Sequence, residues 1–143
     1  MAAGTWQIPN VTRDKLLDGT IDIDTDTWKI ALFLSTSNLD LTKALYTDLS
    51  NEVASAFGYT QDAKSITLTL SGTTTVKIDI SSDPIWTASG GPITARWGVI
   101  YKDAGSQDIL IWCLLDDSPA DVTATDGNTL TLAAHTSGVV TLA

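Results

Sequence analysis

The sequence has little cysteine, little positive charge and no long apolar run. Cys113 is the only cysteine among 143 residues, so an intrachain disulfide is impossible, and a buried, inert thiol of a protein made in a reducing cytoplasm is expected. Eight Lys and Arg oppose 17 Asp and Glu, and the net charge of -9 argues against nucleic acid, because phosphate binding needs clustered positive charge. No stretch approaches the roughly 18 consecutive apolar residues of a membrane helix. We therefore expect no nucleic acid and no membrane as partners, and a charged partner should be basic.

Residue patterns that support catalysis are also missing. His135 is the only histidine, and it lies in a predicted turn. Pairing it with Cys113 as base and nucleophile would require two distant segments to meet, so a surface histidine is the preferred interpretation. The sequence contains no phosphate-binding loop, no dinucleotide glycine fingerprint and no Cys/His zinc cluster. We therefore predict no catalytic residues, no cofactor, no metal, and a protein that is not an enzyme.

Alternate acidic residues at Asp22, Asp24 and Asp26 resemble the opening of a calcium-binding loop. The template fails at its two diagnostic positions, where Thr27 stands for the expected glycine and Phe33 for the expected glutamate. The preferred interpretation is a solvated loop stabilised by Asx turns, in which an aspartate side chain accepts hydrogen bonds from nearby backbone N–H groups.

The N-terminal region predicts a short helix that follows an arm. Thr12 can serve as an N-cap and Gly19 as a left-handed stop, which leaves fewer than two helical turns. The preceding residues lack the basic-then-apolar pattern of a signal peptide, so an unexported protein is expected. Residues 1–11 could extend as an N-terminal arm.

Alternation of apolar and polar residues predicts the first strands. Residues 28–34 form a strand whose two faces are both apolar, which indicates a central position in a sheet. Residues 66–70 and 76–80 alternate around a turn at Gly72 and predict a hairpin with one buried face. Residues 37–60 show no clear period.

Two more hairpins follow. Residues 94–101 pair with 109–115 around a polar turn, and 129–132 pair with 138–142. Seven or eight short strands with almost no helix signal indicate an all-β fold, either an antiparallel β-sandwich or a jelly-roll-like barrel with one short N-terminal helix. Residues 1–143 are expected to form a single β-sandwich domain, long enough to bury its own core.

Five tryptophans are unevenly placed along the chain. Trp28 and Trp97 lie in strand patterns and are expected in the core. In residues 109–115 both faces are apolar, so the second face must be covered by another sheet, a loop or a neighbouring subunit. We assign to that second face Leu110, Trp112 and Leu114.

The N-terminal arm carries its own aromatic residue. Trp6, together with Ile8, either ties the arm to the sheet of the same domain or anchors it on a partner. The candidate interface residues are therefore Trp6, Ile8, Leu110, Trp112 and Leu114.

Four segments in the same order resemble a family of small all-β virion structural proteins of tailed phages and prophages. They are residues 15–34, residues 50–53 together with 58–60, residues 93–103, and residues 137–142. No single segment is diagnostic, but their order and spacing cover most of the chain. The sequence differs from the family pattern around Trp86 and in the short loop 103–108.

The resemblance implies a virion structural role without catalysis. The preferred role is a capsid decoration or cement protein, which would form a dimer or trimer, bind the major capsid protein on the capsid surface and be assembled in the cytoplasm of a bacterial host. Stabilisation would then come from many copies that each bridge adjacent capsomers.

Two alternatives remain from the sequence. A tail component, such as a tube, terminator or tip protein, should assemble into rings through sheet edges, whereas a cement protein should form small closed oligomers. A carbohydrate-binding β-sandwich would use Trp86 or Trp112 to stack on sugar rings.

Overall fold

The computed structural model describes residues 3–143. Within this range the chain forms one α-helix, one short 3-10 helix (η1) and eleven strands, and all strand pairings are antiparallel. The predicted all-β class with one short N-terminal helix is confirmed. In chain order the elements are α1 (Asn10–Leu17), β1 (Trp28–Phe33), η1 (Tyr46–Asp48), β2 (Ser65–Ile66), β3 (Leu68–Ser71), β4 (Val76–Ile80), β5 (Ile85–Thr87), β6 (Ile93–Ala95), β7 (Trp97–Lys102), β8 (Ile109–Leu114), β9 (Val122–Ala124), β10 (Thr129–Thr131) and β11 (Val140–Leu142).

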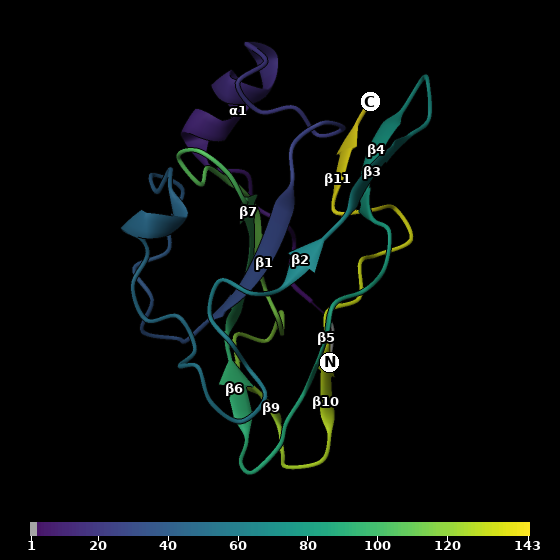
Figure 1. Ribbon diagram of the computed structural model, residues 1–143. Helices are drawn as coiled ribbons and strands as arrows, with labels where there is room; N and C mark the ends of the chain where they lie inside the picture. Colours follow the sequence, from purple (N-terminus) through teal and green to yellow (C-terminus); the bar gives the residue numbers. More distant parts are fainter. Residues whose placement is uncertain (1–2) are drawn as a thin grey trace.

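A four-stranded sheet of order β2-β1-β7-β8 runs through the middle of the molecule (Figure 1). Strand β1 lies between β2 and β7, and Ile30 and Leu32 point into the main core. Ala31 and Phe33 belong to a second buried cluster on the opposite face. Because both faces of β1 are buried, its sequence is continuously apolar, and its predicted central position is confirmed.

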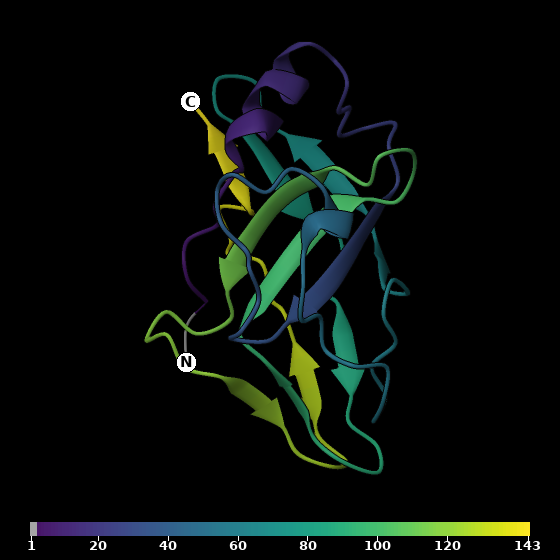
Figure 2. The same cartoon turned by 90° about the vertical axis from the view of Figure 1, so that its left-hand side faces the viewer.

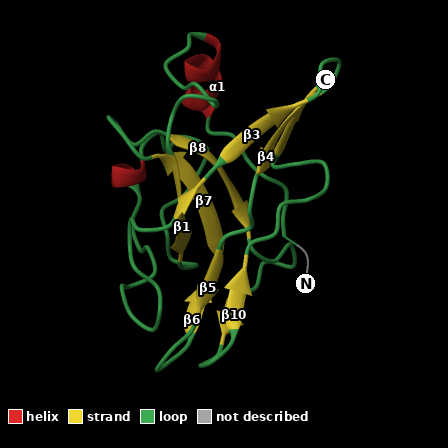
Figure 3. Cartoon of the chain, turned by 45° about the vertical axis from the view of Figure 1, so that its right-hand side comes forward, coloured by secondary structure: helices red, strands yellow, loops and turns green. Residues whose placement is uncertain are grey.

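Three smaller sheets share the main core with the first face of this sheet. Their orders are β11-β4-β3, β10-β5 and β6-β9. Helix α1 lies at one end of the molecule, and the β5–β10 and β6–β9 pairs lie at the other (Figures 2 and 3). Every sheet contributes a buried side chain to the core, as in Ile100, Ile78, Trp86 and Ile93. Each such burial stabilises the fold by about 1.5–3 kcal/mol, which makes this β-sandwich-like core the main connection between the sheets.

The helix begins earlier than predicted. It follows Pro9, and Thr12, the expected N-cap, lies inside it. The Thr12 side chain is buried and donates a hydrogen bond from Oγ1 to the Ile109 carbonyl oxygen at 2.6 Å. Thr12 therefore ties α1 to β8 and does not cap the helix. Gly19, with φ of 79°, lies just beyond the helix, so the predicted left-handed stop is confirmed.

Two of the three predicted hairpins are present. In each, one end of a predicted strand pairs with a different strand from the one expected. Strands β3 and β4 pair as expected, but Ser65–Ile66 separates from β3 and pairs with β1. Strands β7 and β8 also pair, but Ile93–Ala95 turns away and pairs with β9.

The third predicted hairpin is wrong. Strand β10 pairs with β5, which places Leu130 opposite Trp86, and β11 pairs with β4, which places Val140 opposite Ile78. Trp86 and Ile78 are both buried in the main core. A direct β10–β11 hairpin would have left these core positions without their partners, so burial outweighs the local turn.

Candidate interface

The N-terminal strap, which we define as residues 4–8, is tied to the edge of β8. Gly4 N–H donates to the Leu114 carbonyl at 2.9 Å, and the backbone groups of Gln7 and Trp112 exchange hydrogen bonds of 2.7 and 3.0 Å. Of the predicted arm at 1–11, residues 1–2 lie outside the described residues, and residues 10–11 belong to α1. Of the two possibilities left by the sequence, the structure shows the strap on its own sheet.

One side of the strap borders a groove. Trp6 and Ile8 are half-buried against the main core, and together with residues 133–141 they line a depression of about 800 Å³. Because Gln7 directs its backbone groups toward β8, its neighbours direct theirs away from it. Within residues 3–143, Trp6 and Ile8 make no backbone hydrogen bond. The strap is thus an exposed sheet edge beside a partly apolar groove.

The three candidates in β8 do not share one face. A β-bulge shifts the register, so that Ile100 lies opposite Ile111 but Tyr101 lies opposite Ile109. The extra residue, Leu110, is fully buried in the main core. The prediction that Leu110 accompanies Trp112 on the second face is wrong, because the bulge reverses the alternation at that point.

The second face of the sheet is covered by the chain's own loop. Leu39, Tyr46 and Leu49, from the segment 34–52, pack on the cluster formed around Phe33 and Tyr101. Trp112 joins this cluster and meets Trp97 edge to face, with ring centroids 5.4 Å apart. Leu114 is half-buried, with its Cβ close to Gly4 of the strap. Of the three possible covers for this face, namely another sheet, a loop or a neighbouring subunit, the structure shows a loop.

Of the two tryptophans proposed to stack on sugars, Trp86 is buried and Trp112 is half-buried. Trp86 is 3% exposed and lies beside Tyr59, with the Lys64 ammonium 5.4 Å from its ring centroid. Of the predicted core tryptophans, Trp28 lies in the main core, whereas Trp97 is half-buried at the edge of the second cluster.

Glu52 joins Tyr59, which belongs to the main core, to Tyr46, which packs on the second cluster. Tyr59 donates a hydrogen bond to Glu52 Oε1 at 2.7 Å, and Tyr46 donates to Oε2. The Tyr59 oxygen also accepts the Leu32 N–H of β1 at 2.9 Å. Burial, followed by the adjacent Glu52, raises the pKa of both tyrosines, so their hydroxyls remain protonated donors. This cluster fastens the long loop to the central sheet.

A second polar cluster extends from Tyr46. The Tyr46 and Tyr101 rings stack with centroids 4.1 Å apart, and Tyr101 donates to Asp62 Oδ1 at 2.7 Å. Lys29 Nζ lies 3.2 Å from Asp62 and 2.7 Å from Asp103. The Tyr101 hydrogen bond, with support from Lys29, holds the pKa of Asp62 below its usual range despite partial burial. Strands β1 and β7 and the loop are joined by these contacts.

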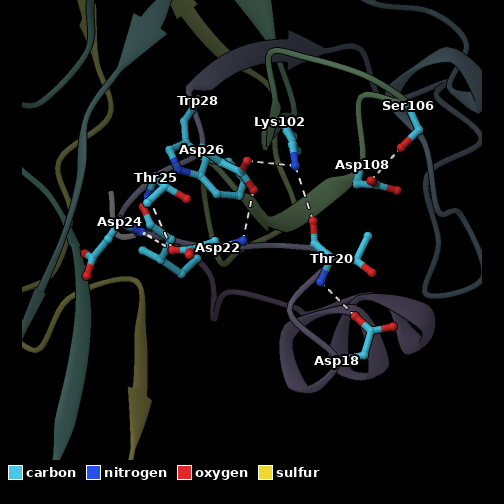
Figure 4. A network of polar contacts seen from close by, with 11 residues as sticks. Asp18, Thr20, Asp22, Asp24, Thr25, Asp26, Trp28, Lys102, Ser106 and Asp108 are labelled. Carbon is cyan, nitrogen blue, oxygen red and sulfur yellow. Dashed lines mark hydrogen bonds and ion pairs between the residues drawn. The ribbon is translucent and has the colours of Figure 1, made fainter.

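The acidic loop folds through its own backbone, as the sequence predicted. Asp22 accepts hydrogen bonds from the N–H groups of Asp24 and Thr25 at 3.0 and 3.3 Å, which are Asx-type turns (Figure 4). Asp26 pairs with Lys102 of β7 at 2.7 Å. Partial burial alone would raise the pKa of Asp26, but Lys102 and the Asp22 N–H outweigh it and lower that pKa.

Helix α1 is held by a buried ion pair. Lys15 Nζ contacts Asp108, whose side chain is 3% exposed and also accepts the Ser106 hydroxyl at 2.6 Å. Together with the Thr12 hydrogen bond, this pair positions the helix on the β7–β8 turn.

Cys113 and His135, the two residues considered for catalysis, lie in different environments. Cys113 is fully buried in the main core, and burial raises the pKa of its thiol to about 12. His135 is exposed, and its Nδ1 accepts the Ser137 N–H at 3.1 Å. The predicted buried thiol and surface histidine are both confirmed.

Within residues 3–143 no three or more His, Cys, Asp or Glu side chains are arranged to hold a metal ion. None of the helices in this range is long and apolar enough to span a bilayer. Comparison of the chain with protein-family models, curated proteins and solved structures returned no match.

No sequence pattern predicts the inward polar clusters. Tyr46, Glu52 and Asp62 lie in or beside the segment without clear periodicity, and only the fold brings them to Tyr101. No local pattern distinguishes Glu52 from Asp40 and Asp48 in the same segment.

Proposed function

We propose that this chain is a non-enzymatic structural protein of a tailed-phage virion. Its role is that of a capsid decoration or cement protein, which binds the shell of major capsid protein from the outside and stabilises it. The observation that carries the proposal is that three of the four segments responsible for the family resemblance, all except residues 137–142, hold one another in place.

These contacts involve specific side chains. Residues 15–34 meet residues 93–103 through Lys29 with Asp103 and through Asp26 with Lys102, both at 2.7 Å. Tyr59 donates a hydrogen bond to Glu52 of the same segment at 2.7 Å and accepts the Leu32 N–H of residues 15–34 at 2.9 Å. The polar side chains of the resembling segments are therefore engaged in building a scaffold, which supports a structural role.

The surface supports binding to other chains. The strap offers an exposed sheet edge next to the groove lined by Trp6 and Ile8. The net charge of -9 favours a basic partner surface. A dimer or trimer that contacts neighbouring capsomers would add several weak contacts, so that the shell opens only when they break together.

The proposal is tested with the purified protein and expanded shells from the phage that encodes it. We expect a discrete dimer or trimer in size-exclusion chromatography with light scattering, and saturable cosedimentation with the shells. A protein that stays in the supernatant at every shell concentration would contradict the proposal.

A tail component is the second candidate, because the strap and β3 both present outer sheet edges through which subunits could join into rings. Electron microscopy of the concentrated protein distinguishes the two. Closed rings or tubes, together with absence of shell binding, would favour the tail.

A further inference from the structure

The turn at residues 56–59 places an aromatic residue where the backbone disfavours it. Tyr59 N–H donates to the Ala56 carbonyl at 3.0 Å, and the two central residues, Phe57 and Gly58, have φ of 55° and 90°. Positive φ at both positions defines a type I′ turn, which favours Asn-Gly. Elsewhere between β1 and β2, positive φ occurs at Asn51 and Asp62, and asparagine and aspartate adopt this conformation more readily than most residues. Phe57 is the exception.

Phe57 is also the exposed aromatic residue of this protein. All ten aromatic residues lie within the described range, and nine of them are buried or half-buried. Phe57 is 47% exposed. A strained backbone that displays an apolar ring to solvent is a cost to folding, and such outliers concentrate at functional positions.

The surroundings of Phe57 are rigid. Its carbonyl accepts the Ser89 N–H at 3.1 Å, and Gly58 packs so closely on the Thr87 carbonyl that a Cβ at Gly58 would lie 2.0 Å from it. The next turn is tied in as well, since Gly90 N–H donates to Asp126 Oδ1 at 2.7 Å and Gly127 N–H donates to the Ala88 carbonyl at 2.9 Å. The turn that carries Phe57 is therefore preorganised by its contacts with the β5–β6 connection, which lies at the end of the molecule opposite α1 (Figure 1).

One internal contact must be weighed against a binding role. The Phe57 ring lies against Gly91, where a Cβ would come within 2.6 Å of it. Despite this contact, Phe57 remains 47% exposed. If Phe57 served only as a clamp on Gly91, removing the ring would destabilise the isolated protein.

We propose that Phe57 is the anchor by which this protein attaches to the capsid shell, inserted into an apolar pocket with a basic rim on the major capsid protein. The basic rim follows from charge, because the exposed Asp126 binds Gly90 in the neighbouring turn and the whole chain carries a net charge of -9. A rigid aromatic ring is the kind of residue that dominates interface energetics, and repetition over many copies strengthens a modest single contact. This inference rests on the proposed function.

Two substitutions separate the anchor from the clamp. Phe57→Ala removes the ring but keeps a Cβ at positive φ, whereas Phe57→Asn removes the ring and suits the turn. We expect both to weaken cosedimentation with expanded shells by at least about 30-fold. The melting temperature of Phe57→Asn should equal or exceed that of the wild type by up to about 4 °C, and should exceed that of Phe57→Ala.

Leu17→Asn is the matched control. Leu17 is 89% exposed at the C-terminal end of α1, at the far end of the molecule, and its substitution should leave shell binding unchanged. The control shows whether loss of any exposed apolar side chain weakens binding.

The outcomes separate the anchor role of Phe57 from the decoration role of the whole protein. Wild-type binding that persists in Phe57→Asn overturns the anchor and leaves the decoration role intact. A clear fall in the melting temperature of Phe57→Asn identifies Phe57 as a clamp and also overturns the anchor. Failure of the wild type to bind shells overturns the proposed function and this inference with it.

Discussion

Two parts of the loop 34–64 use the same kinds of residue in opposite ways. Tyr46 and Tyr59 turn inward, and Glu52 accepts hydrogen bonds from both of their hydroxyls. Two residues before Tyr59, Phe57 turns outward on a strained backbone. In the first part, both tyrosines have hydrogen-bond partners that stabilise the fold. In the second, asparagine would suit the backbone conformation at position 57 better than phenylalanine does. The comparison suggests that the inner part maintains the structure and the outer part contacts a partner.

The largest loss of stability should follow from breaking the inner contacts at α1. Lys15→Met leaves the Asp108 carboxylate buried, with the Ser106 hydroxyl as its one remaining side-chain partner within residues 3–143. We expect a decrease of about 3 kcal/mol in the free energy of unfolding, measured by urea denaturation. Lys43→Met serves as the control, because Lys43 forms no ion pair within residues 3–143, and it should change stability by less than about 0.5 kcal/mol. Equal effects of the two substitutions would contradict the structural role of the pair.

The tyrosine cluster should give the next largest effect. Glu52→Ala removes the acceptor of two half-buried or buried hydroxyls and should cost about 2 kcal/mol, whereas Tyr59→Phe should cost about 1 kcal/mol. Because the two residues share a hydrogen bond, the double variant should lose less than the sum of the single losses. Strict additivity in this double-mutant cycle would show that the contact contributes nothing.

The strongly periodic parts of the fold could be predicted from sequence. Residues 28–34, with apolar side chains on both faces, form β1 in the centre of a sheet, and the β3–β4 and β7–β8 hairpins lie close to their predicted places. Alternation and local turns were sufficient there, because the partner strands are neighbours in sequence.

Non-local pairing and single-residue shifts could not be predicted. The partners of β10 and β11 are set by contacts with Trp86 and Ile78, which no local pattern records. One extra residue at Leu110 reversed the predicted face of β8. At the proposed anchor, Gly58 indicates a turn. The type I′ geometry could not be predicted, because Phe57 occupies the position where such turns favour asparagine.

The strap should contribute less than the inner clusters, since three backbone hydrogen bonds tie it to β8. Gln7→Pro removes the N–H that donates to Trp112 and should cost about 1 kcal/mol. Hydrogen exchange at the Trp112 amide should accelerate as the strap loosens. Thr5→Pro is the matched control, because the Thr5 N–H makes no backbone hydrogen bond within residues 3–143. If Trp112 kept the same protection in both variants, the strap would not hold the edge of β8.

The smallest effect should appear on acidification. The pKa of Asp62 is lowered by Tyr101 and Lys29, and that of Asp26 by Lys102 against the effect of burial. A carboxylate with a lower pKa in the folded than in the unfolded state stabilises the fold above the unfolded value of about 3.9, and this stabilisation is lost as the pH falls through the folded value. The urea midpoint should therefore be flat between about pH 7 and 5 and fall below about pH 4. Asp62→Asn should make that fall shallower. An unchanged slope would contradict the claim that the ionised Asp62 carboxylate stabilises the fold.

The most direct measurement of the central claim is calorimetry of expanded capsid shells with and without saturating amounts of this protein. The account predicts that the shell transition moves to higher temperature, because a ligand that binds the assembled shell stabilises it by mass action. It also predicts that Phe57→Asn, at the same concentration, produces a much smaller shift. A shell transition that stays at the same temperature with saturating wild-type protein would contradict the decoration role.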